Sequence, residues 1–455
     1  RWVVSFSRSQ AVAFLSVVAV NSSFLLNAMS IMLLPDCFLL LIIFPLMETI
    51  RKIAAAGPGE GRTGDFIFLG LLLGLAGLAK YTAILFVPPL IVYLIMKKRY
   101  DLLYAPRMFL AAGIALIVIS PVLYWNIQHD FISFRYQGGH VLAPTAPSIK
   151  SFLVSLLAQF GAYSPFLFAV AFYGLARGWK ETDDRLRLAV LFGVTLLIFF
   201  LYSSLYERTL PHWPSLFYLL FIPVGACCLL SSGSRKQRNF FYFSVGFSLT
   251  LTLFLYAALP AKWFTFPDYQ SPFRDIVGYE LIAREADALL KQGPPGGGGE
   301  ASLPGTGGLE TPVPGGAASP HVTVGGGNSR PDAAPRNDQA LSSRGKTPKT
   351  AFPADSKRAL AVTNWTLGSR MLYYSLPYGQ EVYVLDNRTD QFDVWQTPPL
   401  GYDLLFVKTY FHGLDISPAY RCDACTSVKK IDIVLNGGKV DSVEFVWCRN
   451  YRGTK

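Results

Sequence analysis

Long apolar segments recur from about residue 11 to residue 259 and dominate what this chain can fold into. Blocks of roughly 18 or more apolar residues exceed most buried helices of soluble proteins and are typical of membrane-spanning helices. We expect nine spans, at 11–27, 36–50, 66–79, 81–96, 108–125, 151–175, 188–204, 214–232 and 239–259. The two short segments at 66–79 and 81–96 predict a hairpin with Lys80 and Tyr81 at its tip.

Composition agrees with a membrane protein. Residues are 51% hydrophobic and 16% charged, whereas soluble domains carry about 25% charged residues. The net charge of +11 comes from Lys and Arg in short runs between apolar segments. Nucleic-acid-binding proteins instead gather such residues on one basic face, so we exclude nucleic acid as a partner.

Basic residues also predict the orientation, because short cytoplasmic loops are enriched in Lys and Arg. With Arg1 in the cytoplasm, the inside loops hold about 16 of these residues and the outside loops roughly 4. An odd number of spans then places everything after Leu259 outside. We therefore expect a multi-pass membrane protein with an extracytoplasmic C-terminal part.

Composition changes along the chain predict four regions. A transmembrane part covers 1–259, and the start of an external domain covers 260–292. A Gly/Pro/Ser-rich stretch at 293–356 predicts a disordered insertion. From 357 to 455, short strand-like runs alternate with helical patterns, which predicts an external α/β domain. The expected strands are 359–363, 381–385, 403–408, 429–434 and 440–448, with helices at 276–290 and 367–376.

Several motifs, in their order along the chain, resemble bacterial glycosyltransferase family 39, a group related to protein O-mannosyltransferases and to the aminoarabinose transferase of lipid A. The motifs are Leu33–Leu39, Gly74–Thr82, Pro121–Asn126, Ser133–Gln137 with His140, Leu210–Pro214, Asp386–Arg388 and Gln391–Trp395. The resemblance covers most of 11–292 and 357–455.

The resemblance implies a GT-C architecture, an α-helical membrane bundle with its active site at the outer face of a bacterial inner (plasma) membrane. It implies a polyprenyl-phosphate-linked sugar donor and inversion at the anomeric carbon. Members of the family carry their main catalytic base in a first external loop. We expect that base to lie upstream of Arg1 in a longer protein, with Asp36 in a supporting role.

Asp36 and Lys80 are the charged residues that stand out beside apolar segments. Asp36 either helps to hold substrate or orient a catalytic group, or it caps a helix N-terminus. Lys80 either binds the phosphate of the lipid carrier or is a solvated loop tip. A buried ammonium needs an anion, because its insertion costs roughly 2.5–3.5 kcal/mol.

Two other outside loops carry candidates for the donor phosphate. Arg135, Tyr136 and His140 either bind it or lie in an ordinary interfacial loop. His212 either contributes to the same site or is a solvated imidazole.

Two residues are candidates for binding the sugar or the acceptor. Trp213 either contacts substrate or belongs to the aromatic belt of the membrane interface, which we favour. Arg208 either contacts substrate or pairs with Glu207.

Cysteine chemistry is limited. Cys422, Cys425 and Cys448 lack the second Cys pair of a zinc site, so we expect no metal and no cofactor. One structural disulfide is expected, either Cys422–Cys425 or between one of these and Cys448. Cys37, Cys227 and Cys228 lie in apolar segments and are interpreted as packing residues.

Alternative functions remain at this point. A lipid-binding or transport protein would show internal repeats and charges near the bilayer midplane, whereas the charges here cluster at one face. A truncated, inactive paralogue is the third reading. The acceptor is a lipid, a polysaccharide or a protein.

Overall fold

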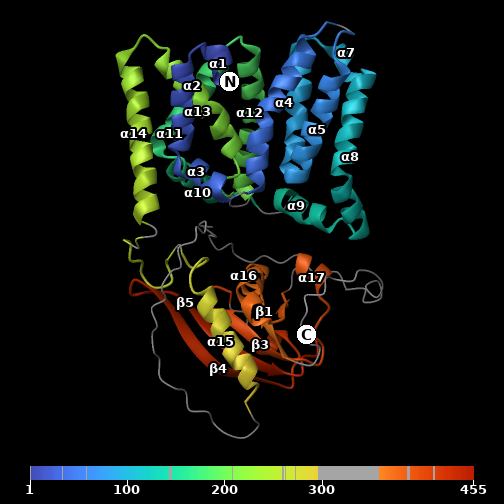
Figure 1. Cartoon of the computed structure of the whole chain (residues 1–455), viewed down its shortest axis with the longest axis vertical. Coiled ribbons are helices and arrows are strands. Elements are labelled where there is room, and N and C mark those ends of the chain that lie inside the picture. Colours follow the sequence, from blue (N-terminus) through green and yellow to red (C-terminus); the bar gives the residue numbers. More distant parts are fainter. Residues whose placement is uncertain are drawn as a thin grey trace. The chain divides into compact units, whose positions relative to one another are not determined.

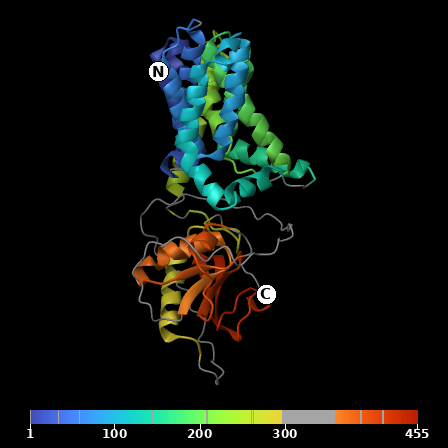
Figure 2. The same cartoon turned by 90° about the vertical axis from the view of Figure 1, so that its right-hand side faces the viewer.

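The computed structural model describes residues 2–32, 34–57, 59–142, 146–206, 209–258, 261, 263–271, 273–295, 358–386, 390–412 and 416–454. The chain divides into two compact units, Arg1–Ala261 and Lys262–Lys455, each with its own buried core. The first unit is helical and the second is built on a β-sheet (Figures 1 and 2). Most of the expected insertion at 293–356 lies outside the described residues.

The helical unit contains helices over all nine apolar segments. They are α1 (Trp2–Ser7), α2 (Gln10–Asn21), α3 (Phe24–Met32), α4 (Pro35–Ala55), α5 (Thr63–Ala79), η1 (Tyr81–Phe86), α6 (Val87–Met96), α7 (Tyr100–Leu103), α8 (Pro106–Gln128), α9 (Ile132–Leu142), α10 (Ile149–Ala162), α11 (Pro165–Gly178), α12 (Asp184–Tyr206), α13 (Ser215–Leu230) and α14 (Arg235–Ala258). Figure 1 shows α9 and α10 at one end of this unit and α7 at the other.

Helix length and bending correct the expectation of nine simple spans. In the described part of the chain, α8, α12 and α14 are each long and apolar enough to cross a membrane. The segment expected at 11–27 is bent by 79° between α2 and α3, and the segment at 151–175 is bent by 104° between α10 and α11. At the second bend Ser164 has φ 73° and Pro165 has no N–H to donate, so the helix cannot continue.

Close backbone contacts hold α11 against α13. A Cβ atom on Gly174 would lie 2.4 Å from the carbonyl oxygen of Phe221, and one on Gly225 would lie 2.2 Å from that of Val170. Small residues permit this close approach, which stabilises helix pairs in a membrane, where the hydrophobic effect does not drive helices together. The interface requires glycine at both positions.

The second unit contains a five-stranded sheet in the order β2-β1-β3-β5-β4. Its strands are β1 (Arg358–Val362), β2 (Val382–Val384), β3 (Asp403–Thr409), β4 (Ala424–Leu435) and β5 (Gly438–Arg449). β1 pairs in parallel with β2 and β3, whereas β5 pairs antiparallel with β3 and β4. Each strand overlaps one of the expected strands.

Helices of this unit are α15 (Tyr279–Gln292), α16 (Trp365–Ser375), η2 (Leu376–Tyr378), α17 (Gln391–Trp395) and α18 (Ile416–Ala419). Alternate strand residues point to opposite faces. One face, with Leu405 and Phe445, packs on α15 and α16. The other face, with Phe406 and Cys448, packs on Ile416, Tyr420 and Tyr451.

Candidate functional site

A partly buried ion pair joins the two charged residues that the sequence singled out. The ammonium of Lys80 donates to Asp36 Oδ1 over 2.7 Å, although 44 residues separate them. The Asp36 side chain is 8% exposed and that of Lys80 is 22% exposed. Lys80 is therefore not a solvated loop tip, because its charge is neutralised by a buried carboxylate.

Helix ends position both partners. Pro35 occupies the first turn of α4 and Leu34 is its N-cap residue, so Asp36 is not the cap that was one reading of the sequence. Lys80 is the extended residue between α5 and η1, with φ −160° and ψ 137°. Since α4 packs against α5, the start of one helix meets the end of the other.

An aromatic ring lies near the Lys80 ammonium. The Lys80 ammonium lies 6.0 Å from the centre of the Trp213 ring, at the outer limit of a cation–π contact. Trp213 belongs to the 210–214 turn before α13, and Tyr163 anchors that turn by donating to Pro211 O at 3.0 Å. Tyr163 also stacks on Tyr218 with 3.7 Å between ring centres.

A chain of hydrogen bonds attaches α9 next to Lys80. Fully buried Asn126 accepts from Ser133 Oγ at 2.6 Å. Ser133 Oγ in turn lies 2.8 Å from the hydroxyl of Tyr81, the residue that follows Lys80. Sequence reasoning selected these motifs but missed the links among Asn126, Ser133 and Tyr81, because nothing in the pattern shows which loop meets which.

Three candidates come from α9. Arg135 is exposed and donates to the carbonyl oxygen of Asp130, five residues earlier. Tyr136 is 48% exposed and takes part in an interaction of its own. The structure places both on the helix held beside Tyr81, whereas the side chain of His140 lies outside the described part.

The turn before α13 holds the remaining candidates. His212 is half-buried beside Trp213 and already takes part in an interaction. Arg208, with its neighbour Glu207, lies outside the described residues. The structure thus pairs Lys80 with Asp36 and places the Lys80 ammonium 6.0 Å from the centre of the Trp213 ring.

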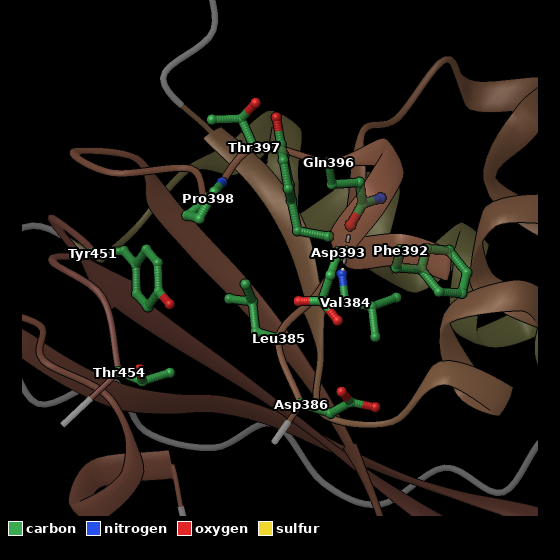
Figure 3. A pocket seen from close by; sticks show the side chains of 11 residues that line it. Val384, Leu385, Asp386, Phe392, Asp393, Gln396, Thr397, Pro398, Tyr451 and Thr454 are labelled. Atoms are coloured by element: carbon green, nitrogen blue, oxygen red, sulfur yellow. Dashed lines mark hydrogen bonds between the residues drawn. The ribbon is translucent and has the colours of Figure 1, made fainter. Parts of the chain in front are cut away.

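Two hollows lie away from this pair. One, of about 350 Å³, is apolar and lined by residues such as Trp2, Val20, Phe44 and Pro223 in the helical unit. The other, of about 40 Å³, lies in the second unit beside Asp386 and Tyr451 (Figure 3). That volume is far below the roughly 300 Å³ of the smallest ordinary ligand sites.

Figure 3 also shows how this small hollow is framed. The side chain of Gln396 accepts from Val384 N at 3.0 Å and donates to Val382 O at 2.6 Å. The amide thereby satisfies the free edge of β2. This arrangement has a structural explanation without a ligand.

Cysteines gather at the end of the sheet. Cys425 and Cys448 form a disulfide, one of the pairings that the sequence left open, and Cys422 is a free thiol. The three sulfur atoms lie within 4.8 Å of one another. Two of the three are bonded to each other, so this state of the cluster offers one thiol.

Part of the helical unit matches a known class of proteins. Residues 3–125 match the model of the dolichyl-phosphate-mannose-protein mannosyltransferase family. This stretch includes Asp36 and Lys80. The resemblance to membrane glycosyltransferases expected from the sequence motifs is thereby confirmed.

A curated relative agrees with the family match. The chain is 26% identical over 241 residues to the lipid A galacturonosyltransferase RgtD of Rhizobium johnstonii (strain DSM 114642 / LMG 32736 / 3841). The alignment covers 50% of this chain and 48% of that protein, so the chain spans about half the length of the curated relative it matches. No solved structure matches the chain significantly.

Proposed function

We propose that the chain is the membrane glycosyltransferase part of a GT-C enzyme that transfers a sugar from a polyprenyl-phosphate carrier to an acceptor, with inversion. The observation that carries the proposal is the partly buried Asp36–Lys80 pair within the stretch that matches the mannosyltransferase family. Both related protein classes act on sugars. A carrier phosphate is an anion that a buried ammonium is suited to hold.

Lys80 has capacity for a second anion. An ammonium carries three N–H donors, and one of them is directed at Asp36. We propose that a phosphate oxygen accepts another. In this arrangement Asp36 is a positioning residue that holds Lys80, while Arg135, Tyr136, His140 and His212 complete the phosphate site as α9 and the 210–214 turn approach the lipid.

Chemistry at the site follows from the leaving group. The acceptor hydroxyl attacks the anomeric carbon, and the bond from that carbon to the phosphate oxygen breaks. Lys80 stabilises the negative charge that develops on the departing polyprenyl phosphate. The hydroxyl proton passes to a carboxylate base. Trp213 and Arg208 remain the candidates for contacting the sugar or the acceptor.

Location is part of the proposal. The excess of Lys and Arg in alternate loops favours an active site at the outer face of a bacterial inner membrane. The same rule assigns the second unit to the extracytoplasmic side, where it is available to recognise a lipid, polysaccharide or protein acceptor. Reporter fusions after Leu259 test this topology, and an inward-facing reporter would refute it.

Sugar transfer provides the direct test of activity. Membranes containing the full-length protein are supplied with radiolabelled polyprenyl-phosphate sugars, and label in lipid, polysaccharide and protein fractions is measured. We expect transfer by the wild type and loss of transfer with Lys80→Ala. Full transfer by Lys80→Ala would refute the phosphate assignment.

A second ion pair supplies the matched control. Lys97 contacts Asp184 at 2.8 Å, and their side chains are 29% and 27% exposed. This pair also joins two helices. Lys97 and Lys80 lie at opposite ends of the η1–α6 segment, because Lys80 precedes η1 and Lys97 follows α6. Lys97→Ala therefore removes a comparable inter-helix charge away from the proposed site, and we expect it to retain transfer.

A further inference from the structure

The three cysteines of the sheet unit combine a disulfide with a thiol in reach of it. Cys425 and Cys448 occupy directly opposite positions on β4 and β5. Cys422 is free, and its sulfur lies within 4.8 Å of both bonded sulfur atoms. We propose that Cys422 makes this cluster a thiol–disulfide exchange site in which the bond moves from Cys425–Cys448 to Cys422–Cys448.

The backbone holds Cys422 in place. Asp423 N donates to Arg449 O at 2.9 Å, and Arg421 N donates to Gly453 O at 2.9 Å. The segment that carries Cys422 is thus fixed to the segment that directly follows Cys448. Exchange needs a rotation of side chains, and it does not require the strands to separate.

The step balances without an oxidant. The Cys422 thiolate attacks Cys448 Sγ, the Cys425–Cys448 bond breaks, and Cys425 leaves as a thiolate that takes up the proton lost by Cys422. Cys425 is the favoured leaving group because β4 is the edge strand and Cys425 is half-buried. Release of Cys448, which is 0% exposed, would place a thiolate in the apolar core.

Burial and a neighbouring carboxylate make the exchange slow at neutral pH. Burial raises the pKa of the Cys422 thiol, and the neighbouring carboxylate of Asp423 raises it further. Asp423 is itself paired with Arg452 and accepts from Asn450 Nδ2 at 2.8 Å. Since the thiolate is the attacking form, the rate of exchange increases as the pH rises.

Peptide mapping of the full chain distinguishes the two bonds. Cleavage before aspartate separates Cys422 from Cys425, because Asp423 lies between them. Protein held near pH 7 or at about pH 8.5, the ordinary pKa of a thiol, is quenched in acid, alkylated and digested without reductant. We expect two disulfide-linked pairs, 415–422 joined to 441–455 and 423–431 joined to 441–455. The ratio of the two pairs should reach its final value faster at the higher pH.

Cysteine-to-serine variants test the proposed exchange. Cys425→Ser, incubated with oxidised glutathione as the electron acceptor, is expected to form the Cys422–Cys448 bond, whereas Cys422→Ser keeps Cys425–Cys448 alone at both pH values. Cys37→Ser, in the helical unit, is the control and leaves the exchange unchanged. A folded Cys425→Ser chain with Cys422 and Cys448 both alkylated would overturn the proposal, and so would a wild-type chain without the 415–422 link at either pH.

Discussion

Neutralising both members of the Asp36–Lys80 pair separates a role in phosphate binding from a role in folding. Lys80→Ala alone is ambiguous, since it leaves Asp36 buried without its counter-charge. Breaking a fully buried pair in this way costs about 3–5 kcal/mol, and the partial exposure of Lys80 reduces that figure. The double variant Asp36→Asn/Lys80→Gln instead leaves two neutral side chains that can hydrogen-bond to each other.

The expected magnitude follows from the contact that is lost. A hydrogen bond to a charged group contributes about 1.5–3 kcal/mol, so losing one from Lys80 to the leaving phosphate lowers kcat/KM by roughly 10- to 150-fold. We expect the double variant to keep the wild-type Tm in detergent while losing this activity. Lys97→Gln/Asp184→Asn should keep both properties.

Kinetics of sugar transfer with varied donor concentration provide the assay, with thermal unfolding measured on the same samples. A double variant with normal stability and near wild-type kcat/KM would refute the reasoning. The pair would then be an inter-helix contact of the kind that Lys97 and Asp184 make.

Three further predictions concern packing, titration and the disulfide. Gly225→Ala should lower the Tm of the full chain, because its new methyl group would clash with Val170 O. Gly113→Ala is the control and should leave the Tm unchanged, because the space around Gly113 is open. An unchanged Tm for Gly225→Ala would contradict the packing of α11 on α13. Burial raises the pKa of Asp441 to about 6 from 3.8, so its contribution to stability is present below about pH 4 and lost as the pH rises through 6. Asp441→Asn should therefore raise the Tm at pH 7 and change it little at pH 4. Asp432→Asn should instead lower the Tm at pH 7, because Lys439 lowers the pKa of the Asp432 carboxyl group. An equal effect of Asp441→Asn at both pH values would contradict the assignment. Cys448→Ser removes a cross-link between residues 23 apart and should cost about 3 kcal/mol of unfolding free energy. Cys425→Ser should cost less, because Cys422 can replace Cys425 as the partner of Cys448. Equal losses of unfolding free energy in denaturant titrations would argue against that replacement.

Local patterns in the sequence predicted much of the helical unit. Apolar segments lie on helices because their length and composition leave few alternatives. The bend at Ser164–Pro165 was missed, since the apolar pattern continues across it while the backbone does not. A run of apolar residues indicates an apolar environment and carries no information about the direction of the backbone.

The sequence alone did not predict which distant residues contact each other. The cost of burying a charge indicated that Lys80 needs an anion, but only the packing of α4 on α5 identifies Asp36 as that anion. The Cys425–Cys448 bond likewise depends on the register of β4 with β5, which the spacing of the cysteines does not determine. The roles of Arg135 and His212 remain predictions.

Binding of the lipid carrier itself tests the central claim most directly. Native mass spectrometry can compare polyprenyl phosphate with polyprenol of the same chain length on the purified full-length protein. We predict that the wild type and Lys97→Ala prefer the phosphate, whereas Lys80→Ala shows a much smaller preference for it. An undiminished preference for the phosphate in Lys80→Ala would contradict the account.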